Sequence, residues 1–112
     1  MKLERDLDVA RWLESVHYSH GLFQWDRGNS TKNRKHGVRN EDVEELFLSP
    51  FVLGGRIIEP YHPENRWILF GQSLAGRKLS LIFTIRDDKI RAVSCRSMRK
   101  EEKRIYETTL KR

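Results

Sequence analysis

The sequence has little cysteine and no long apolar run. Cys95 is the only cysteine in 112 residues, so no intramolecular disulfide can form, and no Cys and His residues have metal-ligand spacing. We therefore expect no metal and no other cofactor. No apolar run approaches the ~18 residues that a membrane-spanning helix needs. The first residues alternate charged and apolar side chains, unlike a targeting peptide, and this indicates a cytoplasmic protein.

Acidic residues are missing from one stretch. Residues 27–40 contain five Lys or Arg and no Asp or Glu, and residues 96–112 contain seven Lys or Arg against three Glu. The net charge is +6. Clustered positive charge favours RNA, DNA or an acidic protein as a partner. A basic surface that serves solubility alone explains the charge equally well.

The residue pattern changes once along the chain, at Pro50. Before it, residues 4–18, 29–35 and 41–48 have the spacing of short amphipathic helices. After it, residues 51–59, 66–72, 78–86 and 89–95 are runs rich in β-branched and aromatic side chains, and residues 99–110 form a closing helix. This order predicts one α+β domain: N-terminal helices, a four-stranded antiparallel meander and a C-terminal helix, with the helices on one face.

Local signals fix several positions within these elements. Asp26 and Asn40 are suitable N-caps for the second and third helices. Gly37, preceded by Lys35 and His36, is a suitable C-terminal stop for the second helix. Alternation along the last strand places Arg91 and Arg96 on opposite faces of the sheet. Cys95 lies in the same apolar-rich segment, so we expect a small core residue and not a nucleophile.

Seven motifs in order resemble the BrnT family over about residues 22–108. They are FQWD (23–26), KNRKHGV (32–38), EDVEELF (41–47), ENRWILFGQS (64–73), GRKLSLIFT (76–84), KIRAVSCRSM (89–98) and EKRIYE (102–107). Each motif is weak by itself, and the ordered set is specific. In the family, two residues usually separate the K-N pair from K-H-G, whereas only Arg34 stands between Asn33 and Lys35 here, which shortens the expected helix.

The resemblance implies a toxin of a type II toxin–antitoxin pair with a RelE-like fold. Such a protein acts as a metal-independent endoribonuclease, inhibits translation by cleaving RNA, on or off the ribosome, and is neutralised by a BrnA-like antitoxin. Residues 22–112 would form the toxin domain, and residues 1–21 a helical extension that packs on its own domain or on a second copy of the chain. Whether the toxin forms homo-oligomers is left open.

RNA cleavage without a metal ion uses the 2′-OH as nucleophile. A base must remove its proton, cations must stabilise the phosphate oxygens, and an acid must protonate the leaving 5′-oxygen. RelE-like toxins gather such groups on the open face of the sheet and on the last helix. By resemblance, the candidates here are Arg66, Arg77, Arg96 and Tyr106, with Lys35 and His36 approaching from the helical side.

Each candidate also has a structural interpretation. Lys35 and His36 suit the negative end of a helix dipole. Arg66 can pair with Glu64, Glu102 can pair with Arg96 or Arg99, Arg77 can be a solvated charge beside a turn, and Tyr106 can pack in the core. Two other functions also remain open: a non-catalytic RNA- or ribosome-binding module, and a poison of a DNA-handling enzyme.

Overall fold

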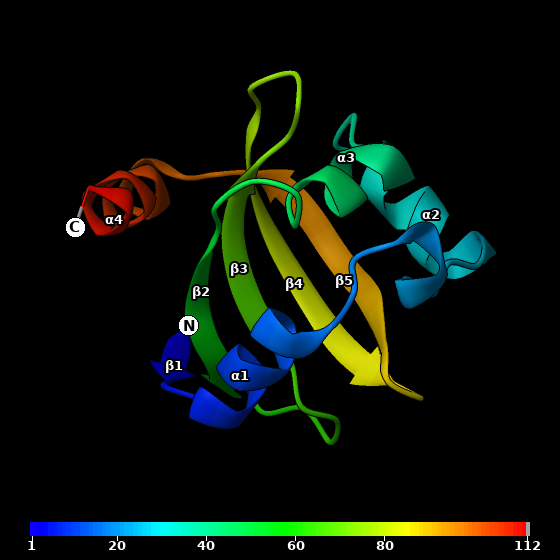
Figure 1. The fold of residues 1–112 in the computed structure, drawn as a ribbon, viewed down its shortest axis with the longest axis horizontal. Coiled ribbons are helices and arrows are strands. Elements are labelled where there is room, and N and C mark those ends of the chain that lie inside the picture. The colour runs from blue at the N-terminus through cyan, green and yellow to red at the C-terminus, as the bar shows by residue number, and fades with distance from the viewer. Residues whose placement is uncertain (112) are drawn as a thin grey trace.

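The computed structural model describes residues 1–111 (Figure 1). In chain order the elements are β1 (Lys2–Glu4), α1 (Leu7–Ser15), a 3-10 turn (His20–Leu22), α2 (Arg27–Arg34), α3 (Asn40–Glu45), β2 (Val52–Glu59), β3 (Trp67–Gln72), β4 (Lys78–Arg86), β5 (Lys89–Ser97) and α4 (Lys100–Leu110). The strands form one antiparallel sheet in the order β1-β2-β3-β4-β5. The α+β class and the four-stranded meander are confirmed, but the sheet has a fifth strand.

Strand β1 and a shorter first helix replace the single helix expected over residues 4–18. Helix α1 begins at Leu7 because Asp6 caps it, accepting a hydrogen bond from the backbone N–H of Val9 at 3.1 Å. The residues before Asp6 pair with β2 instead. Gly55 makes this pairing possible: its φ is +140°, and a Cβ there would lie 2.8 Å from the backbone oxygen of Glu4.

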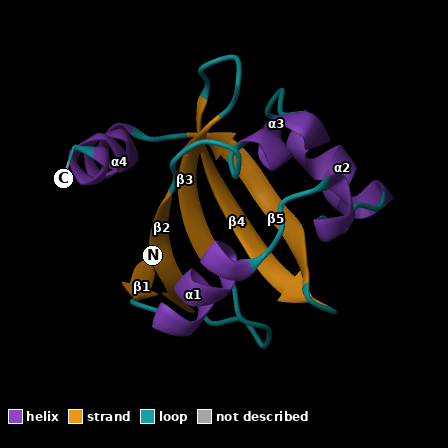
Figure 2. Cartoon of the chain, in the orientation of Figure 1, coloured by secondary structure: helices purple, strands orange, loops and turns teal. Residues whose placement is uncertain are grey.

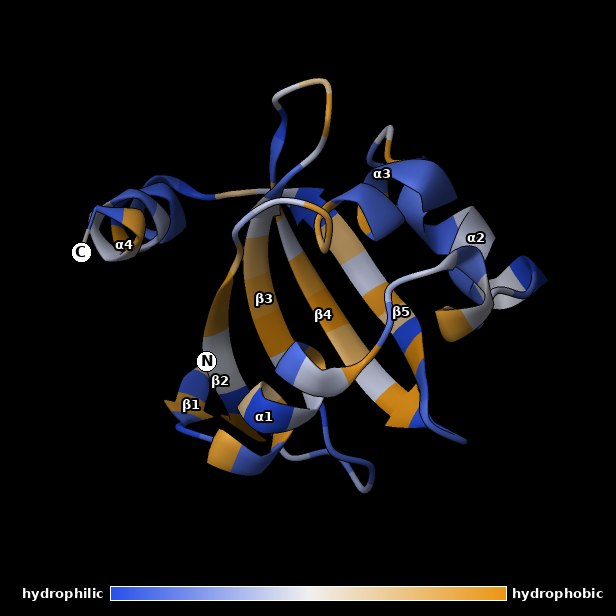
Figure 3. Ribbon diagram, viewed as in Figure 1, coloured by the Kyte–Doolittle hydropathy of each residue, from blue (hydrophilic) through white to orange (hydrophobic). Residues whose placement is uncertain are grey.

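The sheet is covered differently on its two faces (Figure 2). The larger core includes Val9 and Leu13 of α1 and Val43 and Leu46 of α3, which pack with apolar side chains of β3, β4 and β5. Hydrophobic residues accordingly dominate β3 and β4 (Figure 3). Val9 and Leu13 show that the first helix packs on its own domain, which is one of the two arrangements expected from the sequence.

Helix α4 lies on the opposite face, so the prediction that all helices share one face was wrong. It packs against β2 and β3 over a second cluster, Ile57, Ile68, Phe70, Met98 and Tyr106. Figure 1 places α4 well apart from the other helices, beyond β2. The part of this face formed by β4 and β5 is therefore left more open than the part under α4. No helix within residues 1–111 is long and apolar enough to cross a membrane.

A bulge in β5 changes which side chains share a face. Ser94 and Ala92 pair with consecutive residues of β4, so Val93 is an extra residue between them. The extra residue reverses the alternation, and Arg91 and Arg96 both lie on the face that carries α4. The expectation that these two arginines point in opposite directions was therefore wrong.

The remaining boundaries differ from the predictions by a few residues. Asp26 caps α2 as expected, whereas α3 is capped by Arg39 and not by Asn40. The turn between β4 and β5 is made by Asp87 and Asp88, whose φ values are 53° and 58°. Two consecutive residues with positive φ form the tight hairpin that the right-handed twist of the strands favours.

We expect Leu13→Ala to lower the free energy of unfolding by ~2–5 kcal/mol, because it removes a side chain that is only 1% exposed. Leu7→Ala, on the same helix but 51% exposed, should change it by no more than about 0.5 kcal/mol. Urea unfolding of both variants measures the difference. Equal stabilities would contradict the packing of α1 on the sheet.

Candidate active site

The segment KNRKHGV ends helix α2. The helix ends at Arg34, and Lys35 follows as its C-cap. Gly37 has φ +69°, the left-handed conformation that glycine adopts most readily, and its N–H donates to the oxygen of Arg34 at 2.9 Å. The prediction of a helix stop is confirmed. The side chains of Lys35 and His36 are exposed.

Asn33 attaches this helix to the edge of β5. Its side chain is fully buried, and its Oδ1 accepts a hydrogen bond from the backbone N–H of Cys95 at 3.0 Å. Sequence reasoning missed this role, although Asn29 and Asn33 are four residues apart and thus lie on one side of the helix. Cys95 is also fully buried, and burial raises the pKa of its thiol to about 12, so it is the expected core residue.

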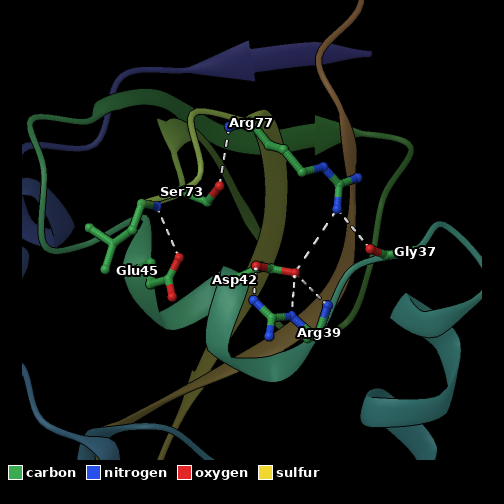
Figure 4. A network of polar contacts seen from close by, with 7 residues as sticks. Gly37, Arg39, Asp42, Glu45, Ser73 and Arg77 are labelled. Carbon is green, nitrogen blue, oxygen red and sulfur yellow. Dashed lines mark hydrogen bonds and ion pairs between the residues drawn. The ribbon is translucent and has the colours of Figure 1, made fainter.

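Arg77 lies beside Gly37, in a polar network at the turn between β3 and β4 (Figure 4). Its Nη1 donates to the Gly37 oxygen at 2.7 Å and lies 4.0 Å from Oδ2 of Asp42. Asp42 is buried, and the side-chain hydrogen bonds of Arg39 hold its pKa below the usual value, against the effect of burial. The backbone N–H of Arg77 donates to Oγ of Ser73. The Arg77 side chain is thus fixed by its hydrogen bond to Gly37, and it is not the solvated charge that the sequence also allowed.

Arg96 joins the end of β5 to α4. Its Nη1 and Nη2 donate to the two carboxylate oxygens of Glu102 at 2.7 and 3.0 Å, and Nη1 also donates to the oxygen of Ser97. Glu102 accepts further hydrogen bonds from Oγ of Ser80 and from the backbone N–H of Arg99. The pairing of Glu102 with Arg96 is therefore confirmed. Because a guanidinium carries five N–H groups, two N–H groups of Arg96, on Nε and Nη2, make no hydrogen bond within residues 1–111.

The environment of Glu102 keeps its carboxylate ionised. Burial would raise the pKa, but the hydrogen bonds from Arg96, Arg99 and Ser80 outweigh burial and lower the pKa to about 2. A carboxylate with so low a pKa is a weak base near neutral pH. Glu102 consequently serves to position Arg96.

Tyr106 is a core residue with its hydroxyl beside charged groups. The side chain is 3% exposed, and its hydroxyl donates to the oxygen of Pro50 over 3.5 Å. Burial raises the pKa of Tyr106, while the positive charge of Lys78 opposes this shift. Lys78 forms an ion pair with Glu107, one position after Tyr106 on α4. The core-packing interpretation of Tyr106 is confirmed.

A small hollow lies at this end of the sheet, and we call it the terminal hollow. It measures ≈ 230 Å³ and is lined by Gly76, Arg77, Lys78, Ser97 and Lys103. Arg96 touches its wall through the hydrogen bond to Ser97, and Gly37 is bonded to Arg77. Sequence reasoning did not single out Lys78 and Lys103, which add two cations to the region.

Arg66 is the candidate that lies elsewhere. It immediately precedes β3, at the end of the sheet opposite the turn that carries Arg77. Its Nη2 lies 3.4 Å from Glu64, as the structural interpretation expected, and Glu64 also accepts two hydrogen bonds from Arg86. Arg77 contacts Gly37 and Asp42 on the side of α3, whereas Arg96 and Tyr106 lie on the face that carries α4. Lys35 and His36 follow α2 with exposed side chains, and Arg66 lies at the other end of the sheet.

Comparison with known proteins identifies the family. A family model described as the ribonuclease toxin BrnT of type II toxin–antitoxin systems matches residues 25–102, which is more than half of the chain. The chain belongs to the BrnT family. Membership implies RNA as the substrate and an antitoxin protein as a partner of this BrnT protein. None of the curated proteins compared with the chain matches it.

Acid should destabilise the protein partly through Glu102. Because its folded pKa lies below its ordinary value of 4.5, its contribution is complete above about pH 5 and is lost as the pH falls toward 2. We expect Glu102→Gln to lower stability at pH 7 by at most ~3 kcal/mol and to reduce the loss between pH 5 and 2. Thermal unfolding across this range measures both effects.

Glu101→Gln is the matched control, because Glu101 is exposed and pairs only with the exposed Arg104 within residues 1–111. Its pH dependence should stay close to that of the unmodified protein. If Glu102→Gln and Glu101→Gln behaved alike, the interaction of Glu102 with Arg96 would not contribute to acid stability.

Proposed function

We propose that this BrnT protein is an endoribonuclease that cleaves RNA without a metal ion and thereby inhibits translation. The observation that supports this best is the terminal hollow, which Arg77, Lys78 and Lys103 line and to which Arg96 is joined by its hydrogen bond to Ser97. Cations placed around one small cavity suit a phosphate group whose oxygens gain negative charge during cleavage. An arginine is well suited because its planar guanidinium can donate hydrogen bonds to two phosphate oxygens at once.

In the proposed reaction the 2′-oxygen attacks the adjacent phosphorus, and the bond from phosphorus to the 5′-oxygen breaks. A base takes the 2′-OH proton and an acid gives a proton to the leaving 5′-oxygen, so the products are a 2′,3′-cyclic phosphate and a 5′-OH end. Arg77 and Arg96 stabilise the phosphate oxygens. Both arginines are already fixed by protein groups, so little reorganisation is needed during the reaction.

His36 is the best candidate for the proton transfers. Glu102 is too acidic to act as a base, and the Tyr106 hydroxyl, whose pKa burial raises above its ordinary value of 10, is a poor base near neutral pH. Histidine is the residue type that most readily exchanges a proton in this range. The adjacent Gly37 accepts a hydrogen bond from Arg77, which lines the terminal hollow, so His36 lies next to a residue in contact with that lining.

The test is to incubate the purified protein with total RNA in the presence of EDTA. We expect RNA fragments with 2′,3′-cyclic phosphate and 5′-OH ends. Intact RNA with retarded mobility would contradict the enzymatic proposal and indicate a binding module. Intact RNA together with damaged DNA in arrested cells would indicate a poison of a DNA-handling enzyme.

Two substitutions distinguish charge stabilisation from proton transfer. Arg77→Gln should lower the cleavage rate about a hundredfold at every pH, because one well-placed donor contributes ~3 kcal/mol to the transition state. His36→Gln should also lower the rate, and it should remove one limb of the pH–rate profile because the imidazole no longer exchanges a proton. The measurement is single-turnover cleavage from pH 5 to 9.

Arg104→Gln is the control for both substitutions, because Arg104 is exposed and its side chain pairs with Glu101 of its own helix. It should cleave RNA like the unmodified protein. An unchanged pH profile with full activity in His36→Gln would show that Lys35 and His36 only end the helix.

A further inference from the structure

A second hollow lies where α2 meets the edge of β5, at the opposite end of the sheet from the terminal hollow. We call it the arginine hollow. It measures ≈ 190 Å³, and its lining includes Lys32, Glu64, Arg66, Arg86 and Arg91. Four of these residues are cations and one is an acid. Because of the bulge at Val93, Arg91 points to the same face of the sheet as Arg96.

The acids near the arginine hollow do not balance its cations. Glu64 is shared between two guanidinium groups: it accepts at 2.9 and 3.2 Å from Arg86 but only at 3.4 Å from Arg66. Ion-paired hydrogen bonds of good geometry measure about 2.7–2.9 Å, so Arg66 is poorly satisfied. Its Nε is buried without any hydrogen-bond partner among the described residues. The Arg66 side chain as a whole is 26% exposed, so an acceptor from outside the chain can reach the exposed part of the guanidinium.

Asp26 and Lys32 determine how much positive charge in the arginine hollow has no ion-pair partner. Asp26 forms an ion pair with Arg91 at 2.8 Å and also caps α2, so Asp26 is already committed. Lys32 is exposed and forms no ion pair within residues 1–111. Arg66 and Arg86 thus share the single carboxylate of Glu64, and the charge of Lys32 is left unpaired among residues 1–111. A ligand with negative charge and several acceptor oxygens matches this arrangement.

Size and spacing favour a backbone phosphate over a larger ligand. A cavity of ≈ 190 Å³ lies below the ~300–1,000 Å³ of pockets that enclose drug-sized molecules. Arg91 pairs with Thr84 and Arg96 pairs with Ser80, so about 13 Å of strand separates the two arginines. An extended oligonucleotide covers such a distance within a few nucleotides. The half-buried Ser94 lies between Arg91 and Arg96 on the same face of the sheet.

We propose that the arginine hollow binds a backbone phosphate of the RNA strand, a few nucleotides away from the bond that is cleaved. This inference rests on the proposed function, because it treats the terminal hollow as the place of cleavage. Arg66 is then a residue that binds and positions the substrate, and it takes no part in the chemical step. The site would recognise phosphate and not the identity of a base.

The test compares Lys32→Ala/Arg86→Ala with Lys2→Ala/Arg11→Ala, which removes the same charge from the β1–α1 side of the molecule. All four residues are exposed, so both variants should fold. The probe is a fluorescent single-stranded oligonucleotide of about 12 nucleotides, within the range that single-strand binding sites cover, with 2′-O-methyl groups that block cleavage. Anisotropy at several salt concentrations gives the dissociation constant and its salt dependence, and a matching RNA gives the cleavage kinetics.

We expect the hollow variant to bind the oligonucleotide about tenfold more weakly, with a salt slope smaller by ~0.7, the value for one lost phosphate contact. Its loss in RNA cleavage should appear in KM more than in kcat, whereas the control variant should bind and cleave normally. If the unmodified protein cleaves RNA and the hollow variant binds as tightly as the control, the arginine hollow is not a phosphate site.

Failure of the proposed function gives a different result. If the unmodified protein does not cleave RNA but its binding still depends on Lys32 and Arg86, the enzymatic proposal fails and the phosphate site stands. If the hollow variant binds RNA normally but loses affinity for the antitoxin, the hollow is a docking site for an acidic protein segment, and the phosphate proposal is overturned.

Discussion

The backbone N–H of Cys95 donates to Oδ1 of Asn33, and this hydrogen bond holds α2 along the edge of β5. Lys32 precedes Asn33 and lines the arginine hollow, whereas Lys35 and His36 follow it and lead to the contact with Arg77. One buried amide therefore aligns the helix with both basic regions. Leaving its partner unsatisfied would cost about 1–3 kcal/mol, and the arginine hollow would lose the wall that α2 forms.

Three carboxylates of this protein hold arginines in place. Glu102 fixes Arg96, Asp42 fixes Arg39 close to Arg77, and Glu64 links two guanidinium groups. In each case ion pairing lowers the pKa of the carboxyl group, so the negative charge persists near neutral pH. Cations held in advance of substrate binding stabilise developing charge more effectively than mobile ones.

The sequence predicts much of the fold because its signals are local. Runs rich in β-branched and aromatic residues mark four strands, and Asp26 and Gly37 mark the start and end of α2. The bulge at Val93 has no glycine or proline to mark it, and its one signal is that Ala92 and Val93 are adjacent apolar residues in an otherwise alternating segment. Strand β1 forms only because Gly55 of β2 leaves room for it, which is a contact between distant segments.

The candidate site was predictable by residue type but not by arrangement. Basic residues, a histidine and a tyrosine in ordered motifs indicated phosphate chemistry. The grouping of Arg77 with Gly37, and the separation of Arg66 from Arg96, depend on contacts between segments far apart in the chain. No periodicity within a strand or helix encodes such pairings.

The borders of the sheet limit how another polypeptide can attach. Residues 23–33 run beside β5, with the N–H of Gln24 bonded to Ile90 and Asn33 bonded to Cys95. On the other side β1 pairs with Arg56–Glu59 and has only three residues itself. Within residues 1–111, a partner that adds a β-strand would find little continuous backbone to pair with. A protein that recognises this fold through its surface must therefore rely on side chains, and the most abundant charged side chains available to it are basic.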